Sequence, residues 1–192
     1  MMKELLSSKE LIRRHVRQCK QQLSQEERDQ QSQEILSLLE EHPLFQEARI
    51  VLLYASLPDE VQTLSFIERW KNKKQILLPI VVGDELELRC YSGNCSLWQG
   101  RYGILEPQAE RLFTDYASID LAIVPGVAFT LSGKRLGRGK GYYDRLFSHP
   151  AFSEVYKIGL AFSFQIFPAL PMDSYDIPLD ELLTLRSAKS TT

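Results

Sequence analysis

The chain has 192 residues, of which 44% are hydrophobic and 10% aromatic, enough to bury the core of one domain. Its 23 Lys and Arg residues against 25 Asp and Glu give a formal net charge of −2, which argues against a general attraction to nucleic acid or anionic membranes. Charges interrupt the apolar residues of the N-terminus and no later apolar run is long enough to span a bilayer, so a cytoplasmic protein without a membrane partner is expected.

Two helices are predicted within residues 8–42. Ser7 and Ser24 each stand three residues before a glutamate, the spacing of a capping box, in which the serine side chain satisfies a free backbone N–H at the start of a helix. The first helix is expected to run to about Leu23. The second should stop just before Pro43, because proline cannot continue a helix.

Short apolar runs then replace the helical pattern, at residues 49–56, 75–80, 119–125 and 156–162. Runs that are apolar on both faces suit strands that are covered on both sides. A helix-length amphipathic segment at 63–73 separates the first two runs, and a further helix is expected from Gly141 to Phe147.

Alternation of strands and helices predicts a three-layer α/β/α fold with a largely parallel central sheet. Residues 85–92 alternate in polarity and should form an edge or hairpin strand. With no internal repeat or linker, the chain is expected to be one domain over residues 1–192, with an α/β core at 49–186 and a loose tail at 187–192.

The segment GKRLGRGKGYYD at residues 133–144 carries the strongest functional signal. It follows the predicted strand at 119–125, whose carboxyl end is where open α/β sheets bind ligands. The Ser-Gly pair that precedes it indicates a tight turn. Three glycines alternate with Arg138 and Lys140, so backbone N–H groups can approach an anion without obstruction by Cβ atoms while two cations supply charge.

This chemistry fits a polyphosphate, and a helix that begins at Tyr142 would add its positive end. The glycine spacing matches neither the Walker A loop nor the dinucleotide fingerprint. Asp144 is the one acid in the segment and suits Mg²⁺ beside bound phosphates, with a salt bridge to Arg138 or Arg145 as the alternative. A solvated glycine-rich turn and an RNA contact are the alternatives for the whole segment.

The run PGVAFTLSGKRLGRGKGYYDRL, residues 125–146, resembles the signature of the 5-formyltetrahydrofolate cyclo-ligase family, and the resemblance extends from Lys9 to about Leu183. It implies an enzyme that uses Mg-ATP to convert 5-formyltetrahydrofolate into 5,10-methenyltetrahydrofolate, with release of ADP and phosphate. ATP and the folate would meet in one cleft of a three-layer α/β fold. The formyl oxygen would attack the γ-phosphate, N10 would add to the activated carbon, and phosphate would leave.

The resemblance also implies roles for single residues. Arg138 and Lys140 would lie nearest the transferring phosphate, where loss of either cation should damage the rate more than the fold. The other residues implied for ATP binding are Lys9, Arg13, Arg135, Leu136, Gly137, Gly139, Gly141, Tyr142 and Tyr143. The i, i+4 spacing of Lys9 and Arg13 puts both on one helical face, which is equally typical of an ordinary basic face.

Metal and folate contacts follow from the same resemblance. Asp144 and Asp180 match its metal-ligand positions, although a cap of a helix starting at 181 also explains Asp180. Ala55 and Glu60 match the folate side, where a carboxylate can accept two N–H bonds from a pterin, and an exposed loop acid is the alternative. Tyr102 would stack on the pterin or pack in the core, and Tyr142 would close over the ligands.

Two other functions remain open from the sequence. A small-molecule kinase with the same phosphate cradle would leave a stable phosphorylated product, and a single-stranded nucleic-acid binder would show steep salt dependence without ATP turnover. Nothing in the sequence demands a dimer, so a monomer is expected. The three cysteines fit neither a disulfide framework nor a zinc site and are expected to be reduced thiols.

Overall fold

The computed structural model describes residues 8–93, 97–100, 105–107 and 111–185. Its centre is a seven-stranded sheet in the order β11-β10-β7-β1-β2-β3-β6. The five parallel strands are β1 (Ile50–Leu52), β2 (Gln75–Val82), β7 (Leu121–Val124), β10 (Tyr156–Ala161) and β11 (Glu181–Thr184). The antiparallel strands are β3 (Glu85–Cys90) and β6 (Leu112–Phe113). The prediction of a largely parallel sheet in an α/β fold is confirmed.

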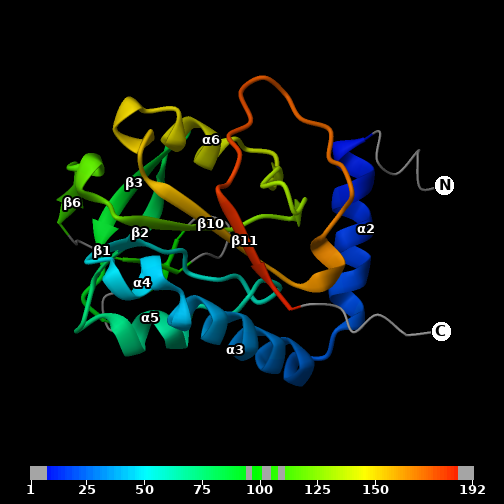
Figure 1. Ribbon diagram of the computed structural model, residues 1–192, viewed down its shortest axis with the longest axis horizontal. Helices are drawn as coiled ribbons and strands as arrows, with labels where there is room; N and C mark the ends of the chain where they lie inside the picture. The colour runs from blue at the N-terminus through cyan, green and yellow to red at the C-terminus, as the bar shows by residue number, and fades with distance from the viewer. Residues whose placement is uncertain (1–7, 94–96, 101–104, 108–110, 186–192) are drawn as a thin grey trace.

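Helices cover both faces of this sheet (Figure 1). In that view α6 (Tyr142–Phe147) lies above the sheet, and three helices lie below it, namely α3 (Gln25–Glu41), α4 (Pro43–Glu47) and α5 (Leu64–Trp70). Helix α2 (Lys9–Gln22) stands to one side. Short 3₁₀ helices are η3 (Tyr116–Ser118), η4 (Pro150–Phe152) and η5 (Ser163–Gln165). Within the described part of the chain, no helix is long and apolar enough to cross a membrane.

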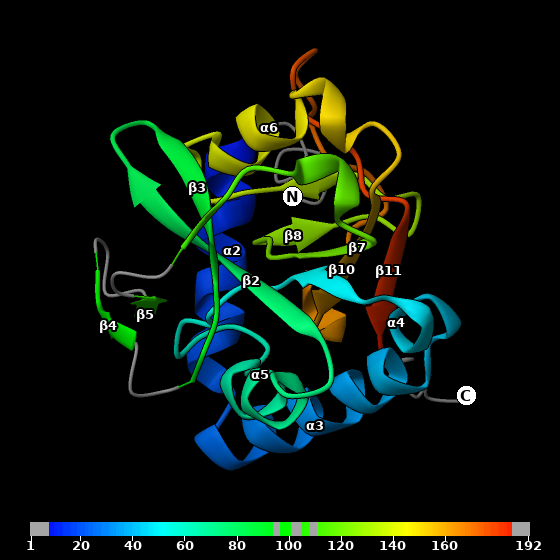
Figure 2. The same cartoon turned by 90° about the vertical axis from the view of Figure 1, so that its left-hand side faces the viewer.

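Two small antiparallel pairs accompany the main sheet. Strands β4 (Leu97–Gln99) and β5 (Leu105–Pro107) form one, and β8 (Ala128–Phe129) and β9 (Arg135–Leu136) form the other. Figure 2 shows α2 running behind the central strands, on the side where β8 lies. The apolar face of α2 packs against the β8–β9 hairpin through Ile12, Val16 and Leu136. The hairpin therefore holds α2 next to the glycine-rich segment.

The two faces of the sheet have separate cores because side chains along a strand alternate in direction. Val51 and Leu53 face the α3–α5 layer, where Phe45 and Phe66 pack with their ring centroids 5.1 Å apart. Leu52 points the other way, into the layer formed by α6 and η4. The prediction that these strands are apolar because both faces are covered is confirmed.

Several boundaries differ from the sequence predictions. The first helix is capped by Ser8, whose hydroxyl accepts from a backbone N–H, and Ser7 lies outside the described residues. The predicted capping box at Ser24 is present. Pro43 ends α3 as expected but also begins α4, because proline is well suited to the first position of a helix.

The sheet resolves two further assignments. Segment 85–92 does form a hairpin strand, β3 with β2, but it is not the edge of the sheet because β6 pairs on its other side. Residues 181–184 form the strand β11 and not a helix, because they complete the sheet beside β10. The explanation of Asp180 as a helix cap was therefore wrong.

Candidate ligand-binding site

A cavity of about 350 Å³ opens at the carboxyl ends of the parallel strands. Tyr54 and Ala55, just after β1, and Pro125 and Gly126, just after β7, line its floor. The other lining residues come from the loop after β1, from β2 and β3, from Glu106, and from the glycine-rich segment, namely Leu57, Glu60, Pro79, Val81, Leu86, Glu106, Arg135, Gly137, Arg138, Lys140, Gly141, Tyr142, Tyr143 and Asp144. The cavity lies where the sequence analysis expected a ligand.

The turn before the glycine-rich segment is present as predicted. The chain reverses between β8 and β9, where Gly133 adopts a φ of 84° and donates its N–H to Thr130 O. Farther along, Gly139 and Gly141 have φ values of 103° and 67°, which side-chain-bearing residues rarely adopt. Helix α6 then begins at Tyr142, as expected.

Arg135 and Asp144 form a buried ion pair beside the cavity. Arg135 donates from Nη2 to Asp144 Oδ1 at 2.7 Å and from Nη1 to Pro125 O at 3.3 Å. The same oxygen of Asp144 accepts from Ile177 N at 3.2 Å. The salt-bridge partner of Asp144 is thus Arg135, and not Arg138 or Arg145 as the sequence analysis considered.

The two expected catalytic cations differ in their surroundings. Arg138 donates from Nη2 to Glu60 Oε1 at 2.7 Å and to Asp59 Oδ1 at 2.9 Å. Burial tends to lower the pKa of Arg138, but the carboxylates of Glu60 and Asp59 outweigh it and raise the value. Lys140 is exposed and makes no hydrogen bond or ion pair to the described residues. The cavity therefore brings Glu60 together with Arg138, from which it is 78 residues away in sequence, and with the neighbouring Lys140.

Helix α2 reaches this loop through Arg13. Its Nε donates to Gly137 O at 2.9 Å, which ties the helix to the glycine-rich segment. Lys9, on the same helical face, instead donates to Asp173 Oδ2 at 2.7 Å and to Asp176 Oδ2 at 2.6 Å. Neither Lys9 nor Arg13 is among the lining residues of the cavity.

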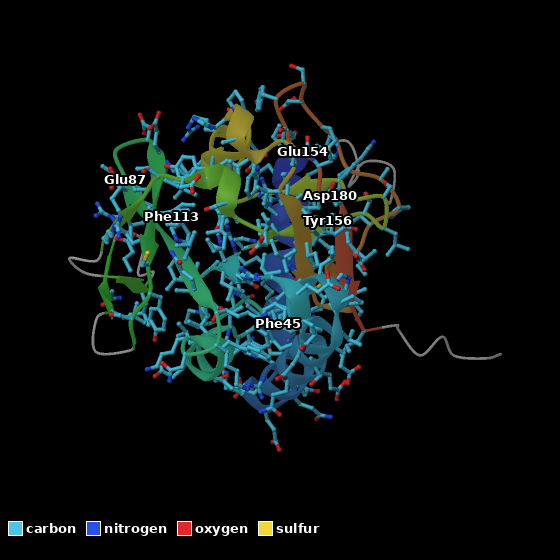
Figure 3. The ribbon with its side chains drawn as sticks, turned by 60° about the vertical axis from the view of Figure 1, so that its left-hand side comes forward. Phe45, Glu87, Phe113, Glu154, Tyr156 and Asp180 are labelled. Carbon is cyan, nitrogen blue, oxygen red and sulfur yellow. The ribbon has the colours of Figure 1, made fainter. Side chains whose placement is uncertain are left out.

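The two expected metal ligands are not brought together. Asp144 lines the cavity, whereas Asp180 immediately precedes β11 at the amino end of the parallel strands. Figure 3 shows Asp180 beside Tyr156, and its carboxylate accepts from Lys157 N at 2.7 Å. Over the described residues, no three His, Cys, Asp or Glu side chains gather as a metal cluster.

The remaining predicted residues divide into lining and supporting positions. Ala55 and Tyr142 line the cavity. Tyr143 also lines it but is largely packed beneath the loop, where burial raises the pKa of its phenol. Leu136 is buried against α2, so only its backbone is available to a ligand. Tyr102 lies outside the described residues.

Sequence reasoning missed three acidic or basic residues of the site. Glu106 lines the cavity and accepts from Val81 N at 3.3 Å, and burial raises the pKa of its carboxyl despite that bond. Asp59 and Lys20 form a 2.9 Å ion pair beside Arg138. Of these three, only Asp59 carried a sequence signal, because it is next to Glu60. Glu106 and Lys20 join the site only through contacts between distant segments.

Known proteins resemble the chain along most of its length. The model of the 5-formyltetrahydrofolate cyclo-ligase family matches residues 6–185. A Caenorhabditis elegans protein named probable 5-formyltetrahydrofolate cyclo-ligase is 33% identical, with 84% of each chain covered. The Escherichia coli K12 5-formyltetrahydrofolate cyclo-ligase is 30% identical, covering 88% of this chain and 96% of its own.

Solved structures give the same picture for the fold. The NMR structure of Aquifex aeolicus 5,10-methenyltetrahydrofolate synthetase superposes with a TM-score of 0.81 at 38% identity, covering 92% of this chain and 89% of its own. A 5,10-methenyltetrahydrofolate synthetase from Mycoplasma pneumoniae superposes with a TM-score of 0.72 at 27% identity, covering 92% and 98%.

Proposed function

The chain belongs to the 5-formyltetrahydrofolate cyclo-ligase family, and from that premise we propose how its residues carry out the ATP-dependent conversion of 5-formyltetrahydrofolate to 5,10-methenyltetrahydrofolate. The observation that carries the proposal is a single cavity lined by two chemically different kinds of charged group. Arg138 and Lys140 come from a glycine-rich loop, and the carboxylate of Glu60, which pairs with Arg138, comes from the loop after β1. These groups suit a polyphosphate and a donor-rich pterin edge.

The reaction needs activation because a formyl oxygen bound to an amide-like carbon is a poor leaving group. In the proposed sequence this oxygen attacks the γ-phosphorus, and the bond from phosphorus to the ADP oxygen breaks. N10 then adds to the activated carbon, its proton is lost, and the carbon–oxygen bond breaks to release phosphate. The formyl oxygen therefore leaves within the phosphate product.

Arg138 and Lys140 would act on the first step. Phosphoryl transfer depends mainly on positioning and on neutralising the charge of the transferred group, which two cations on a loop can supply. Gly139, which lies between these two cations, and Gly141, which follows them, adopt left-handed backbone conformations that shape the loop. Arg13, bonded to Gly137 O, would support the loop from α2 rather than bind phosphate directly. Lys9 is proposed to assist ATP binding indirectly, through its contacts with the 173–176 segment.

Mg²⁺ fits the cavity as an ion that arrives with ATP. Magnesium in such sites is commonly held by one or two carboxylates together with the substrate phosphates, so a large protein cluster is not required. Asp144 would hold it, because its carboxylate lines the cavity and, among the described residues, its bonds to Arg135 and Ile177 use only Oδ1. Asp180 is the weaker proposal because it does not line the cavity. The ion would neutralise phosphate charge.

On the folate side, Glu60 is proposed to accept N–H bonds from the pterin and Ala55 to line its pocket. Tyr142 is proposed to close over the ligands and Tyr102 to stack on the ring. We also propose that the enzyme works as a cytoplasmic monomer that binds no nucleic acid, which fits the small net charge and the free thiols of Cys19 and Cys90.

A near-ultraviolet absorbance assay tests the function directly. Purified protein is mixed with 5-formyltetrahydrofolate and Mg-ATP, and growth of the methenyl absorbance band is expected only when ATP is present. If ATP is consumed but the product is a stable phosphorylated compound without that band, the chain is acting as a kinase. Steeply salt-dependent RNA binding without ATP turnover would support a nucleic-acid binder instead.

A further inference from the structure

Four charged side chains form a network of ion pairs that reaches the cavity through Arg138 and Glu60. Asp59 joins two cations with its two oxygens: Oδ2 lies 2.9 Å from Lys20 Nζ, and Oδ1 lies 2.9 Å from Arg138 Nη2. Arg138 is in turn bonded to Glu60 Oε1 from both Nη2 and Nε, at 2.7 and 3.2 Å. The two positive and two negative formal charges of this network cancel.

The most buried member of this network is Lys20 on α2. Its side chain is only 7% exposed, whereas that of Arg138 is 48% exposed. Burial lowers the pKa of Lys20, and the opposing attraction of Asp59 reduces this effect. Burial also raises the pKa of Asp59, but Lys20 and Arg138 outweigh it and lower the value, as expected for a carboxylate shared by two cations.

We propose that Lys20 and Asp59 are positioning residues that set how readily Arg138 turns from the carboxylates to the phosphates of ATP. The proposal rests on the proposed function, in which Arg138 binds phosphate. The bonds to Asp59 and Glu60 occupy the Nε–H and both N–H groups of Nη2, so Arg138 cannot keep them and also offer a phosphate the two parallel N–H groups of a bidentate contact. Asp59 and ATP therefore compete for Arg138.

Lys20 weakens the hold of Asp59 on Arg138. A carboxylate that already neutralises one buried ammonium attracts a second cation less strongly, because the ammonium group of the lysine repels that cation at short range. Removing the charge of Lys20 leaves Asp59 and Glu60 to act on Arg138 alone and should weaken ATP binding. Neutralising Asp59 removes one competitor and should strengthen ATP binding.

The same exchange couples the two substrates. When ATP draws Arg138 away, Glu60, whose side chain is only 10% exposed in the paired state, loses a charged partner, which favours the arrival of N–H donors from the pterin. Binding of ATP should thus raise the affinity for the folate, and by linkage the folate should raise the affinity for ATP by the same factor. Asp59 controls the size of this coupling because it helps to hold Arg138.

A purely structural role makes a different prediction. If Lys20 and Asp59 only fasten the loop at residues 57–60 to α2, breaking their ion pair from either side should loosen the loop in the same way. Lys20→Met and Asp59→Asn would then both weaken binding. If binding weakens in Lys20→Met and strengthens in Asp59→Asn, the two residues control Arg138. If binding weakens in both, they only fasten the loop.

The test is isothermal titration of the full-length protein with a non-hydrolysable ATP analogue and Mg²⁺. Lys20→Met should raise Kd by about 5-fold or more, Asp59→Asn should lower it several-fold, and Lys20→Arg should restore the native value. Lys74→Met is the matched control, because Lys74 is also buried but donates to Gln46 O and Ala48 O away from the cavity. Its Kd should not change.

Two further variants keep every outcome informative. If Asp59→Asn folds poorly because it leaves Lys20 buried without its partner, the double variant Lys20→Met with Asp59→Asn removes both charges and should bind the analogue more tightly than Lys20→Met alone. Equal or weaker binding by the double variant would overturn the inference. Arg138→Ala tests the premise separately: unchanged affinity there would show that the proposed phosphate role of Arg138 is wrong.

Discussion

Single residues of the glycine-rich segment differ in how much of the fold depends on them. Arg135 is buried and paired with Asp144, so it supports structure as well as any ligand. Lys140 is exposed and lines the cavity, and it has no bond to the described residues that a substitution would break. A role for Lys140 in turnover can therefore be measured without a large effect on stability.

We predict that Lys140→Ala lowers kcat by about 100-fold or more, the usual cost of removing one group that stabilises a transition state, and leaves Tm nearly unchanged. The ATP-dependent absorbance assay and a thermal melt check both parts. Lys134→Ala is the control, because Lys134 is an exposed lysine of the preceding β8–β9 hairpin and does not line the cavity. Full activity of Lys140→Ala would exclude its phosphate role.

Glu106 gives a prediction about pH. Burial raises its pKa above the ordinary 4.5, so the folded state holds the proton more tightly than the unfolded state does. The stabilisation from this group is complete below the unfolded pKa and is lost as the pH rises through the folded pKa. Glu106→Gln cannot lose a proton and still offers an oxygen to Val81 N.

The variant Glu106→Gln should therefore gain Tm relative to the native protein as the pH is raised from 4 to 8. Thermal melts of both proteins across that range measure the difference. A Tm difference that stays constant with pH would mean that the carboxyl titrates alike in both states, and the burial argument for Glu106 would fail.

The residues that the sequence could identify are those within one continuous segment. Gly139, Lys140 and Asp144 stand together in the chain, and their types state the chemistry without knowledge of the fold. Lys20 lies 39 residues before Asp59 and in a helix with several other cations, so nothing local distinguishes it. The structure distinguishes it because it is buried against a single carboxylate.

At the scale of elements, the glycine-rich loop depends on backbone conformations that few residues adopt. Gly139 has a φ of 103°, and a Cβ added there would meet only the guanidinium of Arg13 at ordinary contact distance. Gly83, in the β2–β3 turn, has a φ of 62° and open space around it. Substitution at either glycine therefore tests backbone strain with little steric overlap.

We predict that Gly139→Ala and Gly83→Ala each lower the free energy of unfolding by about 1–2 kcal/mol, the cost of a left-handed conformation for a residue with a Cβ. Only Gly139→Ala should also lower kcat, because only Gly139 lies in the phosphate loop. Denaturant unfolding and the turnover assay distinguish the two effects. Equal loss of activity in both variants would point to stability alone.

Elements with long and distinctive patterns were predictable, and short ones were not. The apolar run in β2 and the capping box of α3 are strong local signals, and both predictions are confirmed. The run in β11 has only four residues and reads equally well as the start of a helix, so its pairing with β10 decides its conformation. Helix α4 was missed because Pro43 was interpreted only as the end of α3, whereas it is also the first residue of α4.

At the scale of the whole molecule, the cavity is formed by one chain. Its lining residues come from β2, β3, β5, the segments that follow β1 and β7, and the glycine-rich loop of the same subunit, so a second copy is not needed to complete it. We predict that the active species sediments at the mass of a single chain, 22.1 kDa, and that specific activity does not depend on protein concentration. A dimer that loses activity on dilution would contradict this.

The position of α2 has a consequence for biosynthesis. This helix is the first described element to leave the ribosome, yet its bonds reach Gly137 and Asp176, at sequence separations of 124 and 167 residues. Contacts between such distant segments form slowly and late during folding. A nascent chain that has not yet exposed Gly137 and Asp176 can build part of the sheet, but its nucleotide loop still lacks its N-terminal brace. The growing polypeptide is therefore expected to gain affinity for ATP only after both contacts of α2 have formed.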